Sequence, residues 1–201
     1  LAETTKDAQY LEIIGQLLSY ENCLYDGNEN NWKDLRGLET QEGAFDSIDL
    51  DKIIEKSPAH MTAWCHGAGG IALARLEVLE KLKGSGKWYA NIKDQVNKDL
   101  VHAGSNLELS VQEDRDEKLC MCHGWLGNLS LLESLYKADI KDMEFTYRHG
   151  KENLVEYVKN KYTRLREIHP EEYFNMGFMT GITGIGYALL RKYSIHLPDV
   201  L

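Results

Sequence analysis

Two Cys-His pairs are the residues of this 201-residue chain whose types and spacing favour chemistry. Cys65-His66 and Cys122-His123 are 57 residues apart, and each pair leads directly into a Gly-x-x-Gly unit. Thiolate sulfur and imidazole nitrogen are ligands that zinc prefers in proteins. Their recurrence at equivalent positions indicates that two copies of one unit converge on a common ion, most economically Zn²⁺.

The predicted metal ligands are Cys65, Cys122 and His123. Both cysteines precede a predicted helix, where the positive end of the helix dipole favours the thiolate. If those helices run side by side, both sulfur atoms emerge at the same end of the bundle, and His123 adds a nitrogen from the turn that holds Cys122. Three protein ligands with an open fourth position are typical of catalytic zinc.

Other ligand sets remain open. His66 is as close to Cys65 as His123 is to Cys122, and Cys120 lies two residues before Cys122. The spacing therefore also allows a closed Cys₂His₂ or Cys₃His site. The ordinary alternative is that both cysteines are small core residues, since free cysteine is among the most buried residue types. Their repetition in register favours the metal.

The remaining cysteine and histidines have no partner by spacing. We expect Cys23 to be an ordinary helix residue. The other five histidines are expected at the surface or in loops: His60, His102, His149, His169 and His196.

Composition narrows the class of function. The chain is 43% hydrophobic, which suffices for the core of one domain, and its formal charge of −9 disfavours nucleic acid as a partner. No apolar run approaches the roughly 20 residues that a bilayer requires, and the polar N-terminus does not resemble a signal peptide. We expect a cytoplasmic protein, in which cysteines are metal ligands or core thiols rather than disulfides.

Three Gly-x-x-Gly units organise the chain around these residues. They begin at Gly67, Gly124 and Gly181 and keep a constant 57-residue period, the signature of a copied supersecondary unit. The segments that follow them are apolar or small on nearly all sides. We therefore expect inner helices, buried on more than one side, that begin near residues 66, 123 and 182.

Longer segments with a single apolar face alternate with these inner helices. Apolar periodicity predicts amphipathic helices over residues 8–25, 88–109 and 153–168. A long irregular stretch over 26–63 contains one expected short helix, through residues 48–54, and connections of that length are commonly functional. The sequence predicts an all-α fold of helical hairpins, with the buried helices inside and the amphipathic helices outside.

Four segments together resemble LanC-like cyclases. The three glycine units carry the family's successive signatures, and the fourth segment lies upstream: Trp64-Cys65-His66-Gly67-Ala68-Gly69-Gly70-Ile71, Cys122-His123-Gly124-Trp125-Leu126-Gly127-Asn128, Gly177-Phe178-Met179-Thr180-Gly181-Ile182-Thr183-Gly184-Ile185-Gly186-Tyr187 and Asn31-Trp32-Lys33-Asp34-Leu35-Arg36. The last two are most similar to the C-terminal domain of LanM-type class II lanthipeptide (lantibiotic) synthetases. The resemblance extends from the first helix to Leu190. It implies an α/α toroid and a zinc ion bound by Cys65, Cys122 and His123.

The activity implied by this resemblance is zinc-dependent lanthipeptide cyclisation. A substrate cysteine takes the fourth zinc position as a thiolate and adds to a dehydroalanine or dehydrobutyrine of the same peptide, which forms a (methyl)lanthionine thioether ring. A general acid must protonate the resulting enolate. His66 is the candidate for donating this proton or for orienting the substrate. The implied partner is a precursor peptide with leader and core parts.

The chain departs from a complete LanC-like ring. Such a toroid has further hairpins before the first motif, including an upstream histidine motif, and nothing in residues 1–58 matches it. We expect residues 1–201 to be the C-terminal portion of a cyclase domain, an incomplete toroid that is inactive alone. Its expected partner is the N-terminal remainder of a synthetase, including a dehydratase domain.

Two other functions compete with cyclisation. One is a non-cyclising LanC-like zinc protein that binds glutathione or another thiol. The other is a structural zinc helical module that binds a partner and catalyses nothing. The long irregular stretch and the Met179-Thr180-Gly181 signature favour the cyclase over the thiol-binding protein.

Overall fold

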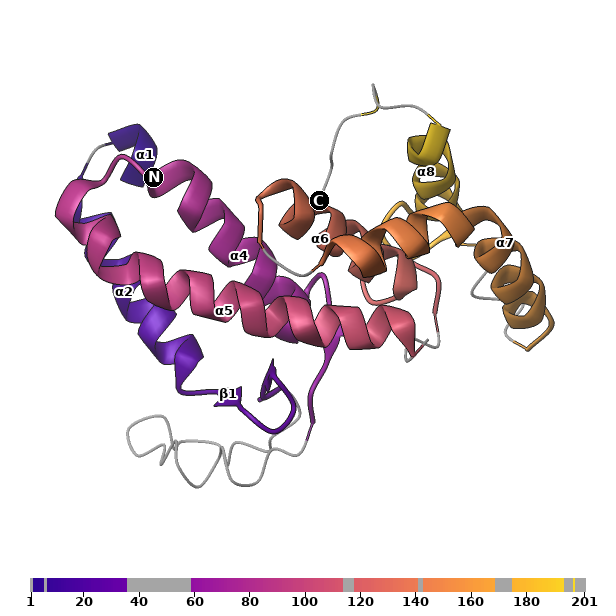
Figure 1. Cartoon of the computed structure of the whole chain (residues 1–201), viewed down its shortest axis with the longest axis horizontal. Helices are drawn as coiled ribbons and strands as arrows, with labels where there is room; N and C mark the ends of the chain where they lie inside the picture. The colour runs from indigo at the N-terminus through magenta and orange to yellow at the C-terminus, as the bar shows by residue number, and fades with distance from the viewer. Residues whose placement is uncertain are drawn as a thin grey trace.

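The structure is a computed structural model that describes residues 2–5, 7–35, 59–113, 118–140, 143–168, 175–193 and 197. Helices make up most of this part of the chain (Figure 1). The predicted all-α class is therefore confirmed. The short helix expected through residues 48–54 lies outside the described residues, as do His169 and His196.

Three helices follow the three glycine units. They are α4 (Gly67–Leu82), α6 (Trp125–Lys137) and α8 (Ile182–Tyr193). Each begins within two residues of the expected position. Helices α4 and α6 are buried over much of their surface, including every residue from 125 to 129.

Helix α8 differs from the other two. Only Gly184, Ile185 and Ala188 are buried in it, whereas Leu190 and Tyr193 are 62% and 75% exposed. The expectation that it is buried on more than one side is wrong for the described part of the chain. Its few buried residues are short or single apolar side chains, and α8 packs on α7.

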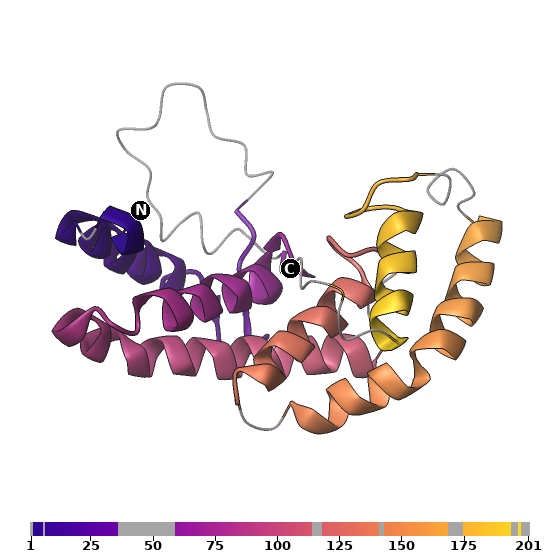
Figure 2. The same cartoon turned by 90° about the horizontal axis from the view of Figure 1, so that it is seen from above.

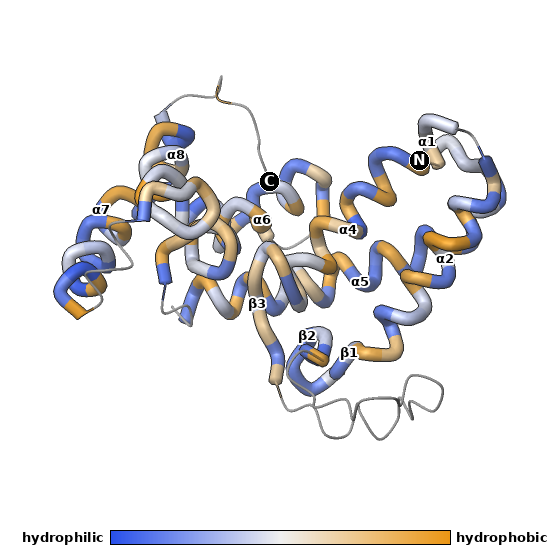
Figure 3. Tube along the Cα trace, turned by 180° about the vertical axis from the view of Figure 1, so that it is seen from behind, coloured by the Kyte–Doolittle hydropathy of each residue, from blue (hydrophilic) through white to orange (hydrophobic). Residues whose placement is uncertain are grey.

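The amphipathic helices are α2 (Ala8–Asn22), α5 (Gly86–Gln112) and α7 (Glu144–Ile168), and a single turn, α1 (Ala2–Thr5), precedes them. Hydrophobic and hydrophilic residues alternate along α2 and α5 (Figure 3). None of the helices within the described ranges is long and apolar enough to cross a bilayer.

Helix α7 begins at Glu144, well before the predicted start near residue 153. The extra turns are held by packing on α6 rather than by a regular apolar pattern. A side chain at Gly150 would collide with Leu129 of α6, so the glycine allows the two helices to approach closely. Tertiary contact thus extends the helix through a segment whose own pattern does not predict it.

Two layers of helices result. Helix α5 packs on both α4 and α6, and α7 packs on both α6 and α8. Figure 2 shows α5 and α7 along one side of the molecule, with α4, α6 and α8 on the other. For α4 and α6 against α5 and α7 the arrangement agrees with the predicted inner and outer helices, whereas α8 is buried on one side only. Fully buried leucines lie between them, among them Leu100, Leu107, Leu126, Leu131 and Leu132.

Short strands lie where the sequence predicts an irregular connection. Strand β1 (Tyr25–Asp26) pairs antiparallel with β2 (Asn31–Trp32), and β3 (Thr62–Ala63) immediately precedes the first Cys-His pair. Asn30 closes the β1–β2 hairpin in the left-handed region, with φ of +48°. This hairpin places Trp32 in the core beside the start of α4.

A buried arginine connects α2 to the α4–α5 hairpin. The side chain of Arg75 on α4 is fully buried, and its Nε donates to Oδ2 of Asp99 on α5 at 2.8 Å. Its Nη1 is paired with Glu21 on α2. Because a buried charge is tolerated only with partners, these carboxylates determine where α2 attaches.

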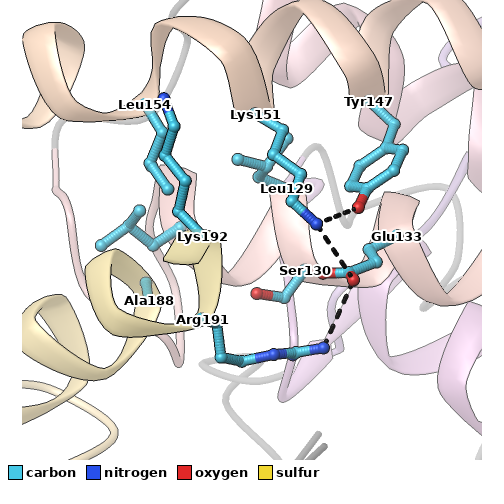
Figure 4. Close-up of a pocket in the computed structure, with 10 residues that line it drawn as sticks. Leu129, Ser130, Glu133, Tyr147, Lys151, Leu154, Ala188, Arg191 and Lys192 are labelled. Atoms are coloured by element: carbon cyan, nitrogen blue, oxygen red, sulfur yellow. Dashed lines mark hydrogen bonds and ion pairs between the residues drawn. The ribbon is translucent and has the colours of Figure 1, made fainter. Parts of the chain in front are cut away.

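An ion cluster joins the last three helices (Figure 4). The Oε1 atom of Glu133 on α6 lies 3.4 Å from Arg191 Nη2 on α8 and 3.7 Å from Lys151 Nζ on α7. Lys151 also donates to the hydroxyl of Tyr147 at 2.7 Å. These groups line a small pocket of about 30 Å³ and help to hold α8 on α6 and α7.

Candidate functional site

The loops that precede the inner helices hydrogen-bond to one another in series. The N–H of Trp64 donates to the carbonyl of Cys122 at 2.9 Å, and the N–H of Cys122 donates to the carbonyl of Met179 at 2.8 Å. Cys122 and Met179 occupy equivalent positions in two copies of the repeat. Stacking of equivalent loops therefore explains why cysteines far apart in the sequence meet.

Glycine is required where each loop folds back on the start of its helix. Gly67 has φ of +63°, and a side chain there would collide with the carbonyl of Met61. A side chain at Gly127 would likewise collide with the carbonyl of Met121. In both loops the carbonyl lies six residues before the glycine, although Gly67 is the first glycine of its unit and Gly127 is the second. Each glycine allows its loop to approach the first turn of the helix closely.

Cys65 and Cys122 come together at these loops. Cys65 is exposed on a tight turn that is closed by a bridge between Ala63 and His66. Cys122 is half-buried in the next loop. Their two thiols lie close enough for the Cys65 thiol to affect the pKa of Cys122. The structure thus brings together the two cysteines that the repeat singles out.

The environment of Cys122 and Cys120 disfavours the ionisation of both thiols. Burial, the Cys65 thiol and the nearby Cys120 thiol raise the pKa of Cys122 to about 11. Burial also raises the pKa of Cys120, an effect partly offset by the backbone N–H groups of His123 and Cys122. Clustered thiols without a positive charge resist becoming thiolates, whereas a cation among them reverses this preference. The donor chemistry of the pair fits zinc.

The third predicted ligand is not gathered with the two thiols. His123 is half-buried, and no three His, Cys, Asp or Glu side chains within the described ranges are arranged to hold a metal ion. A Cys₂His set would require the imidazole of His123 to turn toward the thiols. The structure therefore brings the two predicted cysteines together and leaves His123 as a prediction, with Cys120 still an open alternative.

A large pocket opens beside Cys65. It is an open pocket of about 520 Å³ between α2, β2 and the start of α4, and His66 lines it together with Cys65. Leu24, Trp32 and Ile71 contribute apolar walls, while Lys33 contributes a cation. A space of this size and mixed polarity, next to an exposed thiol, is suited to a peptide or another organic ligand.

Sequence reasoning missed the separate roles of Asn31 and Asp34, which it identified only as parts of a motif. Oδ1 of Asn31 accepts hydrogen bonds from the N–H groups of Ala68 and Trp32, each at 2.8 Å. Oδ1 of Asp34 lies 3.1 Å from Nε2 of His66. The sequence signal that could have indicated these roles is the pair of polar residues, Asn31 and Asp34, on either side of the apolar Trp32. Arg36 of the same motif lies outside the described residues.

His102 is not a surface or loop residue, contrary to expectation. It lies half-buried on α5, with its ring 4.8 Å from the ring of Tyr25 and its Nδ1 3.2 Å from Oδ1 of Asn30. Burial, followed by the charge of Lys98, lowers the pKa of His102. It therefore secures the β1–β2 hairpin on α5. Cys23 caps the end of α2 and is exposed rather than buried, and His149 is exposed on α7 as expected.

Comparisons with known proteins identify the family of this chain. No solved structure matches the chain. It is similar to the lacticin 481/lactococcin biosynthesis protein LcnDR2 of Lactococcus lactis subsp. lactis, with 27% identity over an alignment of 201 positions that covers 94% of this chain and 18% of that protein. The chain thus spans about a fifth of the relative that it matches. Residues 1–198 match the family described as lanthionine synthetase C-like protein. Since this match covers nearly all of the chain and its three glycine-led helices, the chain belongs to the lanthionine synthetase C-like family.

Proposed function

We propose that this chain supplies the zinc-binding part of a lanthipeptide cyclase. The reaction joins the thiol of a substrate cysteine to a dehydroalanine or dehydrobutyrine and so forms a thioether ring. The observation that carries the proposal is the proximity of the thiols of Cys65 and Cys122 at the starts of two inner helices. Membership of the family, and a relative named for lacticin 481 biosynthesis, support a precursor peptide as the substrate.

Cys65, Cys122 and His123 would hold the zinc ion in this proposal. When bound, zinc lowers the pKa of a substrate thiol and keeps its sulfur nucleophilic at neutral pH. Two thiolates and one neutral imidazole balance the charge of the ion and leave one position for the substrate. Cys120 remains buried behind Cys122 as a core thiol.

The residues around the pocket bind and orient the peptide. Trp32 and Ile71 would contact apolar parts of the core peptide beside Cys65. As the new C–S bond forms at the β-carbon, the π electrons of the alkene move toward the α-carbon, which then takes up a proton. His66, whose imidazole lines the pocket next to Cys65, would deliver that proton or orient the alkene.

We also propose that the chain acts within a larger, cytoplasmic LanM-type synthetase that carries a dehydratase domain. The support is the similarity of residues 177–187 and 31–36 to that class, together with the small share of LcnDR2 that the chain spans. The dehydratase would produce the alkenes that the cyclase consumes.

Zinc analysis of the isolated chain tests the metal ligands. We expect the wild-type chain to bind about one zinc ion and the Cys122→Ala variant to lose it, because one of two soft donors is removed. Cys23→Ala is the matched control, since Cys23 is exposed on α2 and far from the loops in sequence. Full zinc retention by Cys122→Ala would show that Cys122 is not a ligand.

Incubation of the complete synthetase with a dehydrated, cysteine-containing precursor tests the reaction. We expect free substrate thiols to disappear with the wild type and to persist with Cys122→Ala. No loss of thiol above background with the wild type would exclude the cyclase. If the synthetase then binds and retains added glutathione, that result would instead support the thiol-binding function.

A further inference from the structure

We propose that Asp34 is a positioning residue for His66, holding its imidazole through Nε2 so that Nδ1 is the nitrogen available to a substrate in the pocket beside Cys65. The inference rests on the proposed function, because His66 has a task there only if the pocket binds substrate. Nothing in the spacing of the sequence connects the two residues, which are 32 positions apart.

The backbone that carries Asp34 is built onto the start of α4. Asn31 accepts from the N–H of Ala68 in the first turn of α4, and its Nδ2 donates to the carbonyl of Met61 at 3.4 Å. The N–H of Asp34 donates to the carbonyl of Ala59 at 2.9 Å. The segment 31–34 is therefore fixed at both ends, through Asn31 to the start of α4 and through Asp34 to Ala59.

The contact between the two side chains is sheltered from water. The side chain of Asp34 is 10% exposed and that of His66 is 28% exposed, while Nε2 itself is buried. Nε2 lies 3.1 Å from Oδ1, yet no well-directed hydrogen bond joins them. A modest rotation of the ring would align the N–H with the carboxylate, as catalytic contacts often tighten only when substrate binds.

The chemistry of the pair determines the tautomer of the imidazole. An ionised carboxylate is only an acceptor, so it favours a proton on Nε2 and leaves Nδ1 unprotonated in the neutral ring. A carboxylate behind a histidine also restricts the orientation of the ring. Asp34 would thus present one defined nitrogen to the pocket.

Histidine NMR of the metal-free 201-residue chain tests the positioning without any need for activity. At about pH 8, we expect His66 to be mainly the Nε2–H tautomer in the wild type. Its signals are assigned with His66→Gln. In Asp34→Asn, whose amide can either accept or donate, we expect the Nδ1–H tautomer to increase several-fold.

Asp26→Asn is the matched control, because Asp26 faces His60 at 3.5 Å in the same manner. It should leave the His66 tautomer unchanged. An unchanged tautomer in Asp34→Asn would overturn the proposal, and so would an equal change in both variants.

The effect of Asp34 on catalysis is tested by measuring cyclisation with the complete synthetase. We expect Asp34→Asn to lower kcat about 10- to 100-fold, with zinc content and the KM for the peptide near wild type, and Asp34→Glu to recover part of the loss. A change confined to KM or to zinc content would overturn the positioning role. If the wild type fails to cyclise while the tautomer still responds to Asp34, the proposed function fails and the positioning of His66 stands.

Discussion

Cys122 shows most directly what single residues contribute to this site. Its thiol is partly buried and lies beside the thiols of Cys65 and Cys120, so forming a thiolate there places negative charge near two further sulfur atoms. Two of these thiols belong to the repeated pattern, and the third does not. A divalent cation bound by the repeated pair would offset the charge that burial alone disfavours.

His102 gives the fold a dependence on pH. Burial lowers the pKa of His102 in the folded chain, whereas the unfolded chain titrates near the ordinary value of about 6.5. Below that value the unfolded state binds more protons than the folded state, so stability must fall as the pH decreases. Above it, both states are neutral at this residue and the effect disappears.

We therefore expect the thermal midpoint to decrease between about pH 7.5 and pH 5.5, and to decrease less in His102→Gln. His149→Gln is the control, because His149 is exposed on α7. Melting followed by circular dichroism at each pH checks this. Identical pH dependence in the wild type and His102→Gln would contradict the assignment.

At the scale of the elements, the loops before the inner helices depend on close backbone packing. The carbonyl of Met121 occupies the space that a side chain at Gly127 would need. The same loop carries Cys122, and its backbone also receives the N–H of Trp64. Displacement of this loop should therefore separate the thiols as well as weaken the fold.

We expect Gly127→Ala to lower the free energy of unfolding by about 1–3 kcal/mol and to weaken zinc binding. Gly186→Ala is the control, since Gly186 lies within α8 with open space around it, and alanine there should stabilise the helix slightly. Chemical denaturation and zinc titration measure the two effects. Unchanged zinc affinity in Gly127→Ala would show that the loop does not position the ligands.

The elements also show which features the sequence could predict. The repeat predicts the meeting of Cys65 and Cys122, because copies with the same backbone present the same atoms to their neighbours. The start of α7 could not be predicted, since the close packing of Gly150 against Leu129 of α6 leaves no periodic pattern in the sequence. The contact of Asp34 with His66 arises from a connection with no periodic pattern, so only the folded chain reveals it.

At the scale of the whole molecule, buried charge determines how α2 joins the hairpins. Arg75 is shielded from solvent and serves both Asp99 and Glu21. Asp99 is itself buried, so removal of the guanidinium would leave an uncompensated carboxylate in the core.

We expect Arg75→Met to lower the free energy of unfolding by about 3–5 kcal/mol. Arg148→Ala should have little effect, because its pairing with Glu144 on α7 is exposed. Denaturant unfolding of both variants checks the contrast. Equal stability of the two variants would mean that Arg75 does not connect α2 to the rest of the molecule.

The hydrogen bonds between the three loops all run the same way along the chain: an N–H of the earlier loop donates to a carbonyl of the next loop. The third copy of the repeat supplies no metal ligand, yet the carbonyl of Met179 holds the backbone of Cys122, whose own carbonyl holds the backbone of Trp64. The copies therefore have different roles, because the first and second loops are each held by a carbonyl of the loop that follows it in the chain. A substitution that moves the loop before α8 would therefore shift the backbone of Cys122, and through it the backbone beside Cys65. The third copy thus helps to position both cysteines although it carries neither.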